Sequence, residues 1–524
     1  MDRRKLFLGC FISLIATAFG FAVRGAILKD WGIEFGLSEE QKGIIQGVGL
    51  YPFAISIILM SLVIDRIGYG TAMVFAFLGH TISAIITIFA SSFEMLYVGT
   101  FLYALANGIV EAVINPVVAT MYDRNKTHWL NVLHAGWPAG LVLGGLLLIG
   151  VQYGGDQLGS TLPGKPWQWQ MALVLIPTLM YGLILVGQRF PVQERVAAGV
   201  SYLDMLREFG WASAYICFLL LIAGVNQILL VAEIKPVELW VQALIALAPT
   251  AVFAYYVRSF GRPMFVFLLL VMFLLATTEL GTDSWISDIM RSVLASPVKG
   301  TLFLVYTSAI MFVLRFFAGP IVHKVSPLGL LTLSAAIACG GLLWLSVAQG
   351  IGMLLLAATF YAFGKTFFWP TTLGVVSEQY PRGGALMMNA IAGVGMLAVG
   401  VLGNPAIGIV QDRGLDRTLQ EESPQLHAAV TVVKPGLLGE TSSLDNAKLD
   451  ALPPAERTKV DELIVQSKQG ALAKIAILPA IMFVCYVLLL IYFRSKGGYR
   501  SEVLTGHGAD DEKFTGGVEG PVEA

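Results

Sequence analysis

The chain has 524 residues, of which 56% are hydrophobic and only 13% are charged. Together with a mean hydropathy of +0.74, this composition excludes an ordinary soluble globular protein. The formal net charge of −1, with basic residues scattered through the predicted loops, gives no general attraction to nucleic acid. The composition therefore predicts an all-α polytopic membrane protein, with the lipid bilayer and no nucleic acid among its partners.

The chemistry-bearing residues exclude several classes of site. Cys10, Cys217, Cys339 and Cys485 all lie within apolar segments, without a Cys-x-x-Cys pair or a His-rich neighbour. We therefore expect no disulfide and no metal site. The sequence also lacks a recognisable nucleotide-binding loop and a nucleophile paired with a base, so we expect no cofactor and no enzymatic activity.

Fourteen apolar stretches are long enough to cross a hydrocarbon core of about 30 Å. The first six are expected near residues 6–28, 42–64, 71–91, 94–120, 130–152 and 170–189. Two more are expected near 211–231 and 238–258, and the last six near 263–288, 300–322, 328–348, 351–377, 384–410 and 471–493.

The segments outside these spans differ in composition. Residues 411–470 are rich in charge, Ser and Pro and are expected to form an external loop, a passive solvated one rather than a lid or partner surface. A helix should begin near Pro453-Pro454 and lead into the last span. The tail, residues 496–524, is rich in Gly and acidic residues and is expected to be disordered.

The short loops are strongly asymmetric in charge. Sixteen Lys and Arg residues fall on one side of the predicted bundle and six on the other. The positive-inside rule therefore places both termini in the cytoplasm, which agrees with an even number of spans.

An internal repeat relates the two ends of the chain at a fixed offset of 258 residues, as 361 − 103 shows. The pairs are Asp65-Arg66 with His323-Lys324, Tyr103 with Tyr361, Tyr122 with Tyr380, Arg124 with Arg382 and Asn131 with Asn389. This repetition predicts a six-helix half over residues 1–190, a second half over 263–495, and a linker with two inserted helices over 191–262.

Two parallel six-helix repeats resemble the major facilitator superfamily. The loop Ser61-Leu-Val-Ile-Asp65-Arg66-Ile-Gly68 is similar to that superfamily's G-x-x-x-D-R-x-G loop, although Ser61 replaces the first glycine. By this resemblance Asp65 and Arg66, with His323 and Lys324 in the second copy, would belong to a cytoplasmic gating network. The alternative is a pair of loop charges that only sets topology.

A narrower resemblance covers residues 35–140. Glu111-Ala-Val-Ile-Asn115-Pro116, followed by Leu130-Asn131 and His134, resembles the E-x-x-x-N-P and L-N-x-x-Q motifs of the fucose:proton symporter family, and Gln41-Lys-Gly43-Ile-Ile-Gln46 resembles its Q-x-G-x-I-Q. The chain departs from that family on the first helix, where Gly25 stands in place of an Asp. The coupling scheme or the cargo could therefore differ.

Glu111 is the strongest functional candidate in the residues themselves. It lies between Val110 and Ala112 in an apolar stretch that spans the bilayer, where a carboxylate is costly. Desolvation favours the protonated form, so this carboxyl could bind and release a proton in the working range. The alternative is a permanently paired structural charge.

Three further charged positions could complete proton coupling. Lys365 maps onto Asn107 at the repeat offset and is the predicted cation for Glu111. Glu279 and Asp283 lie one helical turn apart and should share a face.

Two arginines have other predicted roles. Arg24 could contact the substrate or instead extend to the membrane interface, and Arg315 is expected to be a helix-end anchor.

A small polar cargo would need directed hydrogen bonds and aromatic surfaces. The candidate substrate-binding residues are Arg24, Gln46, Asn107, Asn115, Asn131, His134, Tyr361, Trp369 and Asn389. These observations predict a proton-coupled secondary transporter in the plasma membrane, functional as a monomer, that carries a sugar or sugar-like molecule by alternating access. Symport of a nucleoside or another metabolite, antiport of a drug, and a non-transporting membrane sensor stay open as alternatives.

Overall fold

The computed structural model describes residues 2–37, 39–158, 164–231, 237–295, 297–436, 439–502 and 504. The N-terminal half contains α1 (Arg3–Glu34), α2 (Glu39–Val48), α3 (Tyr51–Ile67), α4 (Tyr69–Ile88), α5 (Phe93–Met121), η1 (Asp123–Asn125), α6 (Lys126–His134), α7 (Gly136–Leu158), α8 (Pro166–Ala172) and α9 (Leu175–Leu185). Three helices follow: α10 (Glu194–Ala197), α11 (Tyr202–Val231) and α12 (Leu239–Val257).

The C-terminal half supplies the remaining elements. They are α13 (Pro263–Ala276), η2 (Thr277–Gly281), α14 (Thr282–Val293), α15 (Pro297–Arg315), α16 (Ala318–Leu345), α17 (Gly350–Lys365), α18 (Phe368–Gln379), η3 (Pro381–Gly383), α19 (Gly384–Ala398), η4 (Val399–Gly403), α20 (Asn404–Glu422), α21 (Pro424–Val430), β1 (Thr431–Gly436), β2 (Gly439–Leu444), α22 (Asn446–Asp450), α23 (Pro454–Ile475) and α24 (Ile477–Ser495).

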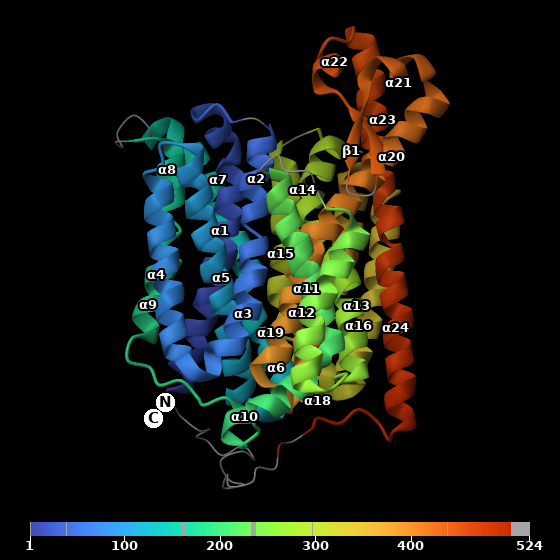
Figure 1. Cartoon of the computed structure of the whole chain (residues 1–524). Coiled ribbons are helices and arrows are strands. Elements are labelled where there is room, and N and C mark those ends of the chain that lie inside the picture. Colours follow the sequence, from blue (N-terminus) through green and yellow to red (C-terminus); the bar gives the residue numbers. More distant parts are fainter. Residues whose placement is uncertain are drawn as a thin grey trace.

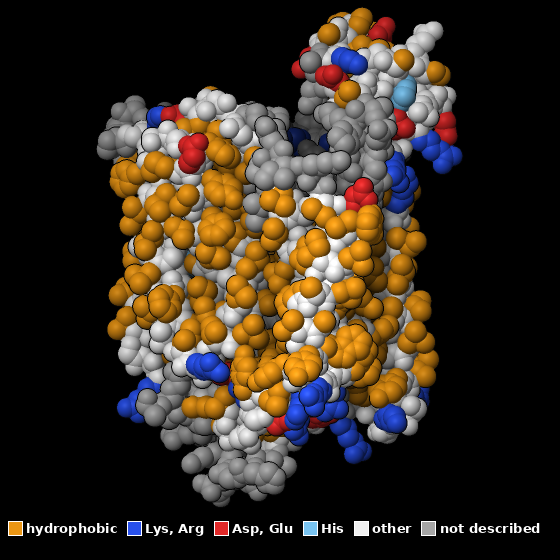
Figure 2. Space-filling model, in the orientation of Figure 1, with side chains coloured by type: hydrophobic (Ala, Val, Ile, Leu, Met, Phe, Trp, Pro, Cys, Tyr) orange, Lys and Arg blue, Asp and Glu red, His pale blue; other side chains and the backbone are white. Residues whose placement is uncertain are grey.

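The helices form an upright bundle in which α1 begins and α24 ends at the same end (Figure 1); we call this end the terminal face. Within the described residues, 13 helical segments are long and apolar enough to cross a membrane. The remaining predicted span, near 300–322, corresponds to α15, which ends at Arg315 and is not among the 13. Hydrophobic side chains cover the middle of the visible face, and Lys and Arg gather near the terminal face (Figure 2). The structure is thus a polytopic helical membrane protein.

The predicted repeat reappears as matching local geometry. The hydroxyl of Tyr103 donates to the carbonyl of Thr17 at 2.7 Å, and that of Tyr361 donates to the carbonyl of Thr278 at 2.6 Å. Helix α5, which carries Tyr103, ends at Tyr122, and α18, which follows the Tyr361 helix α17 in the same span, ends at Tyr380. The backbone is nearly the same at both ends, φ −126° and ψ 51° against φ −136° and ψ 52°. A 3₁₀ turn follows in both places.

The inserted helices α11 and α12 pack on each other, and α11 also packs on α13 and α19 of the C-terminal half. Much of α12 faces outward, with Val252 72% and Tyr255 78% exposed, as expected for lipid contact. At the terminal face, α11 bends at Gly210, whose φ is +70°. A side chain there would collide with the backbone of Gly261, so glycine is required for this close approach.

The predicted external loop, residues 411–470, contains a folded subdomain instead. It stands beyond the bundle at the end opposite the terminal face (Figure 1). Helices α20 and α23 extend into it, and β1 and β2 form an antiparallel hairpin in which Thr431 pairs with Leu444. Its core contains Leu415, Leu419, Val430, Leu449, Val460 and Leu463. Because these residues are spread over almost 50 positions, no local periodicity indicates the core. The predicted helix start near Pro454 is present as α23.

Candidate functional site

The N-terminal half carries a buried hydrogen-bonded chain that starts at Glu111. The amide nitrogen of Asn115, one turn later on α5, donates to the Glu111 carboxylate at 2.7 Å. The amide oxygen of Asn115 lies 2.8 Å from Nε2 of His134 on α6. Since an amide oxygen only accepts, this ring nitrogen carries the proton. Glu111 is 4% exposed and forms no ion pair in the part of the chain that the structure describes.

The C-terminal half holds a second buried carboxylate, Glu279, which is ion-paired. Nη2 of Arg315 lies 3.0 Å from Glu279 Oε1, and both side chains are almost completely buried. The other carboxylate oxygen accepts the backbone N–H of Trp369 at 3.2 Å, at the start of α18, where the helix dipole favours a negative charge. Glu279 lies in η2, a π-helical turn, and such turns are frequent at functional sites.

Arg315 joins the two carboxylates across the interface between the halves. Its Nη1 donates to the carbonyl oxygen of His134, and its Nε donates to the carbonyl of Thr366 at 2.9 Å. Its positive charge also acts on Glu111. Glu111, Asn115, His134, Arg315 and Glu279 therefore form one continuous group, which we call the central network. The predicted role of Arg315 as a helix-end anchor omits this contact between halves.

Three prolines leave backbone carbonyls free to accept hydrogen bonds from side chains at the interface. In a continuous helix the N–H of residue i+4 binds the carbonyl of residue i, and proline has no N–H. Pro138 and Pro370 stand four residues after His134 and Thr366, whose carbonyls accept from Arg315. Pro116 stands four residues after Ala112, whose carbonyl accepts from Asn389 at 3.1 Å. Three helix interruptions thus supply three acceptors at the interface.

The predicted pairing of Lys365 with Glu111 is wrong. Lys365 is fully buried and forms an ion pair with Asp283 on α14, and its Nζ lies 5.4 Å from the centre of the Tyr361 ring. The repeat offset gives Lys365 the same depth as Asn107 but does not fix its partner. Asn107 binds Nε2 of His80 at 2.8 Å within the N-terminal half. The sequence predicts that Glu279 and Asp283 share a helix face. In the structure each forms its own ion pair, Glu279 with Arg315 and Asp283 with Lys365.

The remaining predicted residues fall into different places. Asn131 donates to Thr371 Oγ1 across the halves at 3.1 Å, Trp369 is buried beside Gly395, and Gln46 is exposed. Arg24 does not extend to an interface. It is 7% exposed, donates to Ser83 at 2.9 Å, and lies 3.8 Å over the Tyr103 ring.

The predicted gating residues lie at the terminal face but do not form one pair. Asp65 forms an ion pair with Arg195 of α10. Arg66 lies over the ring of Tyr202, 5.5 Å from its centre. Lys324 is exposed and lines a cavity described below, and the side chain of His323 lies outside the described residues.

The comparisons with known proteins agree with this architecture. The sequence model described as Major Facilitator Superfamily matches residues 10–404. The chain belongs to the major facilitator superfamily. A search of curated proteins found no match.

Solved structures of superfamily transporters share the fold at low sequence identity. The E. coli fucose:proton symporter is 15% identical, with a TM-score of 0.54 over 91% of this chain and 98% of its own. An inward-facing, unoccupied bacterial homologue of the human lysosomal transporter Spinster is 16% identical, with a TM-score of 0.60 over 93% and 96%. The human organic anion transporter MFSD10 is 13% identical, with a TM-score of 0.55 over 93% and 100%.

Several residues of this superfamily member were not singled out by sequence reasoning. His80 and Arg195 bind predicted residues from neighbouring elements. Glu378, on α18, accepts from the backbone N–H and hydroxyl of Thr127 of the opposite half, at 3.2 and 2.5 Å. A charge at the end of a predicted span gave no reason to separate Glu378 from an ordinary loop charge. The prolines were visible, but the partners of their free carbonyls come from distant helices.

Proposed function

We propose that this superfamily member is a proton-coupled symporter that moves a small polar solute by alternating access, with Glu111 as the proton carrier. The observation that carries the proposal is the central network, in which a buried carboxylate, with no ion pair among the described residues, is connected to Arg315 of the opposite half. A carboxylate that lacks a fixed cation in an apolar site is the group most able to change protonation.

Proton binding at Glu111 would change the attraction between the halves. The ionised carboxylate is attracted to the Arg315 charge, whereas the protonated carboxyl is neutral. In a buried site this difference is large enough to shift the balance between two access states. Glu279 and Asp283 each pair with a cation and would keep Arg315 and Lys365 in place.

A sugar or sugar-like molecule is the cargo that we propose. Hydroxyl-rich solutes are held by a few directed amide and carbonyl groups beside aromatic rings. Among the described residues, the amide oxygens of Asn131 and Asn389 are buried without a hydrogen-bond partner. The aromatic rings would come from Tyr361 on α17 and Trp369 on the next helix, α18. The similar structures include symporters of fucose and xylose.

An organic anion is the second candidate cargo, favoured by Arg24. Two of its guanidinium nitrogens, Nε and Nη1, are buried without a partner, and no carboxylate pairs with it among the described residues. A buried cation in this state would gain from an anionic ligand. The human organic anion transporter is among the similar structures.

Uptake into proteoliposomes under an imposed proton gradient tests the proposal. A panel of neutral sugars, nucleosides and organic anions would identify the cargo, with accumulation that collapses when the gradient is dissipated. Glu111→Gln should abolish accumulation but retain solute exchange without a gradient. Full gradient-driven accumulation by this variant would reject the proton role of Glu111, and absence of flux for every solute would favour a sensor.

The orientation and setting follow from the same proposal. We place the terminal face in the cytoplasm because basic residues concentrate there, and the chain in the plasma membrane as a monomer. Asp65, Arg66 and Lys324 would act in the gate at this face. Labelling of an engineered cysteine at Gln188, near the terminal face, by an impermeant reagent in intact cells would test the orientation, because we expect protection.

A further inference from the structure

The segment after the last helix, residues 496–502, runs along the terminal face (Figure 1). Sequence composition predicts disorder for 496–524, of which 503 and 505–524 lie outside the described residues. Helix α24 ends at Ser495, and Gly497 and Gly498 adopt φ values of +90° and +100°. This left-handed backbone favours glycine and reverses the chain direction. The N–H of Gly498 binds the carbonyl of Phe493 at 2.9 Å, and the Tyr499 and Phe493 rings are 5.2 Å apart.

The returning segment, residues 496–502, binds the end of α18 at three points. The Tyr499 hydroxyl donates to Glu378 Oε2 at 2.8 Å, and the N–H of Glu502 donates to the Glu378 carbonyl at 2.8 Å. The side-chain amide of Gln379 donates to the carbonyl of Arg500 at 2.7 Å. Burial, reinforced by the negative charge of Glu378, raises the pKa of Tyr499 well above its ordinary value, so the hydroxyl keeps its proton and donates.

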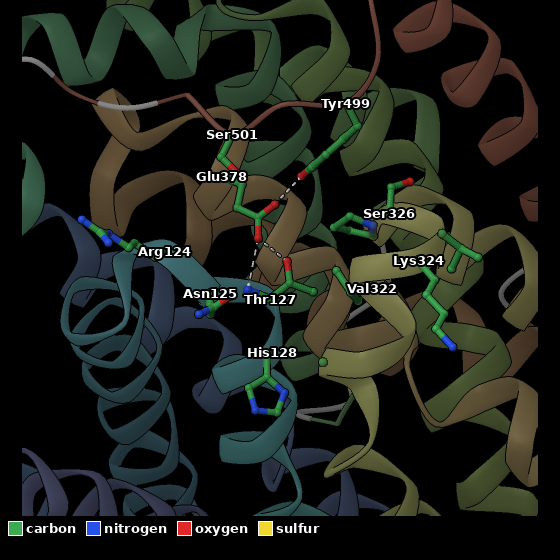
Figure 3. Close-up of a pocket in the computed structure, with 13 residues that line it drawn as sticks. Arg124, Asn125, Thr127, His128, Val322, Lys324, Ser326, Glu378, Tyr499 and Ser501 are labelled. Atoms are coloured by element: carbon green, nitrogen blue, oxygen red, sulfur yellow. Dashed lines mark hydrogen bonds between the residues drawn. The ribbon is translucent and has the colours of Figure 1, made fainter. Parts of the chain in front are cut away.

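The same carboxylate holds the opposite half. Glu378 lies between Tyr499 on one side and Thr127 on the other (Figure 3). Its Oε1 accepts both donors of Thr127 while its Oε2 accepts Tyr499. Gly374 permits this approach, because a side chain there would overlap Thr127. A second bond between halves lies beside it, from Lys126 Nζ to the Ser377 carbonyl at 3.3 Å.

A polar cavity of about 560 Å³ surrounds this contact and is lined by both halves and the tail. Its lining includes Asn125 and Thr127 of the N-terminal half, Lys324 of the C-terminal half, and Tyr499 and Ser501 of the tail. The site is therefore complete only while the halves meet at the terminal face. Water in such a cavity competes for Glu378, which makes the orientation of the carboxylate important.

We propose that segment 496–502 is a strap that stabilises closure of the terminal face, with Tyr499 as the residue that positions Glu378 for its bonds to Thr127. The strap does not itself reach across the interface. It fixes one carboxylate oxygen so that the other points at the opposite half. Release of the strap would leave Glu378 free to rotate toward the cavity, and the terminal face would open more often.

Cysteine accessibility measures this opening without any substrate. Ser377 is 4% exposed and adjoins Glu378, so a cysteine there reacts with a water-soluble maleimide only after opening. In a full-length chain with Cys10, Cys217, Cys339 and Cys485 replaced by alanine, Tyr499→Phe should speed labelling of Ser377→Cys about threefold to tenfold, the range for one hydrogen bond to a charged group with partial coupling.

Two further variants make the result specific. Tyr492→Phe removes a hydroxyl from an exposed tyrosine on the same helix end and should leave the labelling rate unchanged. Glu378→Gln should speed labelling, and adding Tyr499→Phe to it should produce little further change, because Tyr499 acts through Glu378. Equal rates for Tyr499→Phe and Tyr492→Phe, or full additivity of Tyr499→Phe with Glu378→Gln, would overturn the proposal. Neither result depends on the cargo or on proton coupling.

Discussion

The two halves share a framework but treat their buried carboxylates differently. Tyr103 and Tyr361 bind equivalent helices in the same way. Yet Glu111 has an amide partner, whereas Glu279 has Arg315 and Asp283 has Lys365. The repeat therefore conserves backbone geometry while the charges diverge. This difference separates a carboxylate with no ion pair among the described residues from two that each pair with a cation.

The two halves also contribute different hydrogen-bonding groups to the central network and its surroundings. The N-terminal half offers neutral acceptors to the C-terminal half, the carbonyls of Ala112 and His134, which are free because of Pro116 and Pro138. The C-terminal half supplies the donors of these two bonds, Arg315 and Asn389. Arg315 thus lies in one half and Glu111 in the other. If Glu111 carries the proton as we propose, proton binding alters an interaction between halves rather than within one.

The largest effect is expected for Arg315→Gln, which removes the cation of the C-terminal half. Glu279 would be left buried and uncompensated, which costs roughly 3–5 kcal/mol when one partner of a buried pair is removed. We expect a large fall in the melting temperature of the purified protein in detergent. Arg417→Gln, which breaks an exposed pair in the external subdomain, is the control and should melt like the parent. Equal melting of the two variants would contradict the structural role of Arg315.

Neutralising the two glutamates should then give opposite results. Glu279→Gln leaves Arg315 without its countercharge and should lower the melting temperature nearly as much as Arg315→Gln. Glu111→Gln keeps an acceptor for Asn115 and removes a desolvated charge, so its stability should stay within about 1 kcal/mol of the parent. Melting curves of both variants, measured at one pH, make the comparison. A similar loss in both would mean that Glu111 is as firmly paired as Glu279.

Sequence reasoning could predict the parts of this arrangement that depend on depth and composition. The membrane spans and the desolvation cost of a carboxylate at Glu111 follow from the length of the apolar stretches. The repeat follows from a fixed offset between matching residues. Rotation about the helix axis and the choice of partner do not. The repeat offset predicts a deep position for Lys365 and so makes it a candidate cation for Glu111, but in the structure Lys365 of α17 pairs with Asp283 of α14.

Other features depend on tertiary contacts that no local pattern encodes. The π-helical turn that carries Glu279 packs on the similar turn η4, and neither has a sequence signature. The core of the external subdomain joins residues from Leu415 to Leu463. The strap at Tyr499 is short and is held by bonds to α18 and by the contacts of Gly498 and Tyr499 with Phe493 of α24.

A smaller effect is expected when the proline-freed carbonyls regain a helix partner. Alanine at Pro138 or Pro370 provides an N–H for the carbonyl that now accepts from Arg315. Alanine is at least as favourable as proline in a helix, so impaired function would have to arise from the lost acceptor. We expect transport to fall about twofold to tenfold, the worth of one hydrogen bond, with retained expression.

Pro249 provides the matched control for these substitutions. It interrupts the inserted helix α12, which lies outside the central network. Pro249→Ala should leave transport unchanged and raise or preserve the melting temperature. If Pro138→Ala and Pro370→Ala also transport like the parent, the carbonyls of His134 and Thr366 are not important acceptors for Arg315.

The smallest effect is expected for the neutral contact between Asn131 and Thr371, which tests whether closure depends mainly on charge. Asn131→Ala removes one hydrogen bond across the halves, worth about 1 kcal/mol. Thr371→Val removes the same bond from the other side. The double variant should therefore lose no more than Asn131→Ala alone, which also removes the bond from Asn131 to the Thr127 carbonyl at 2.9 Å. Labelling of Ser377→Cys reports each change. Because the central network stays intact, a rise in labelling larger than that caused by Arg315→Gln would show that neutral contacts, rather than the charges, hold the halves together.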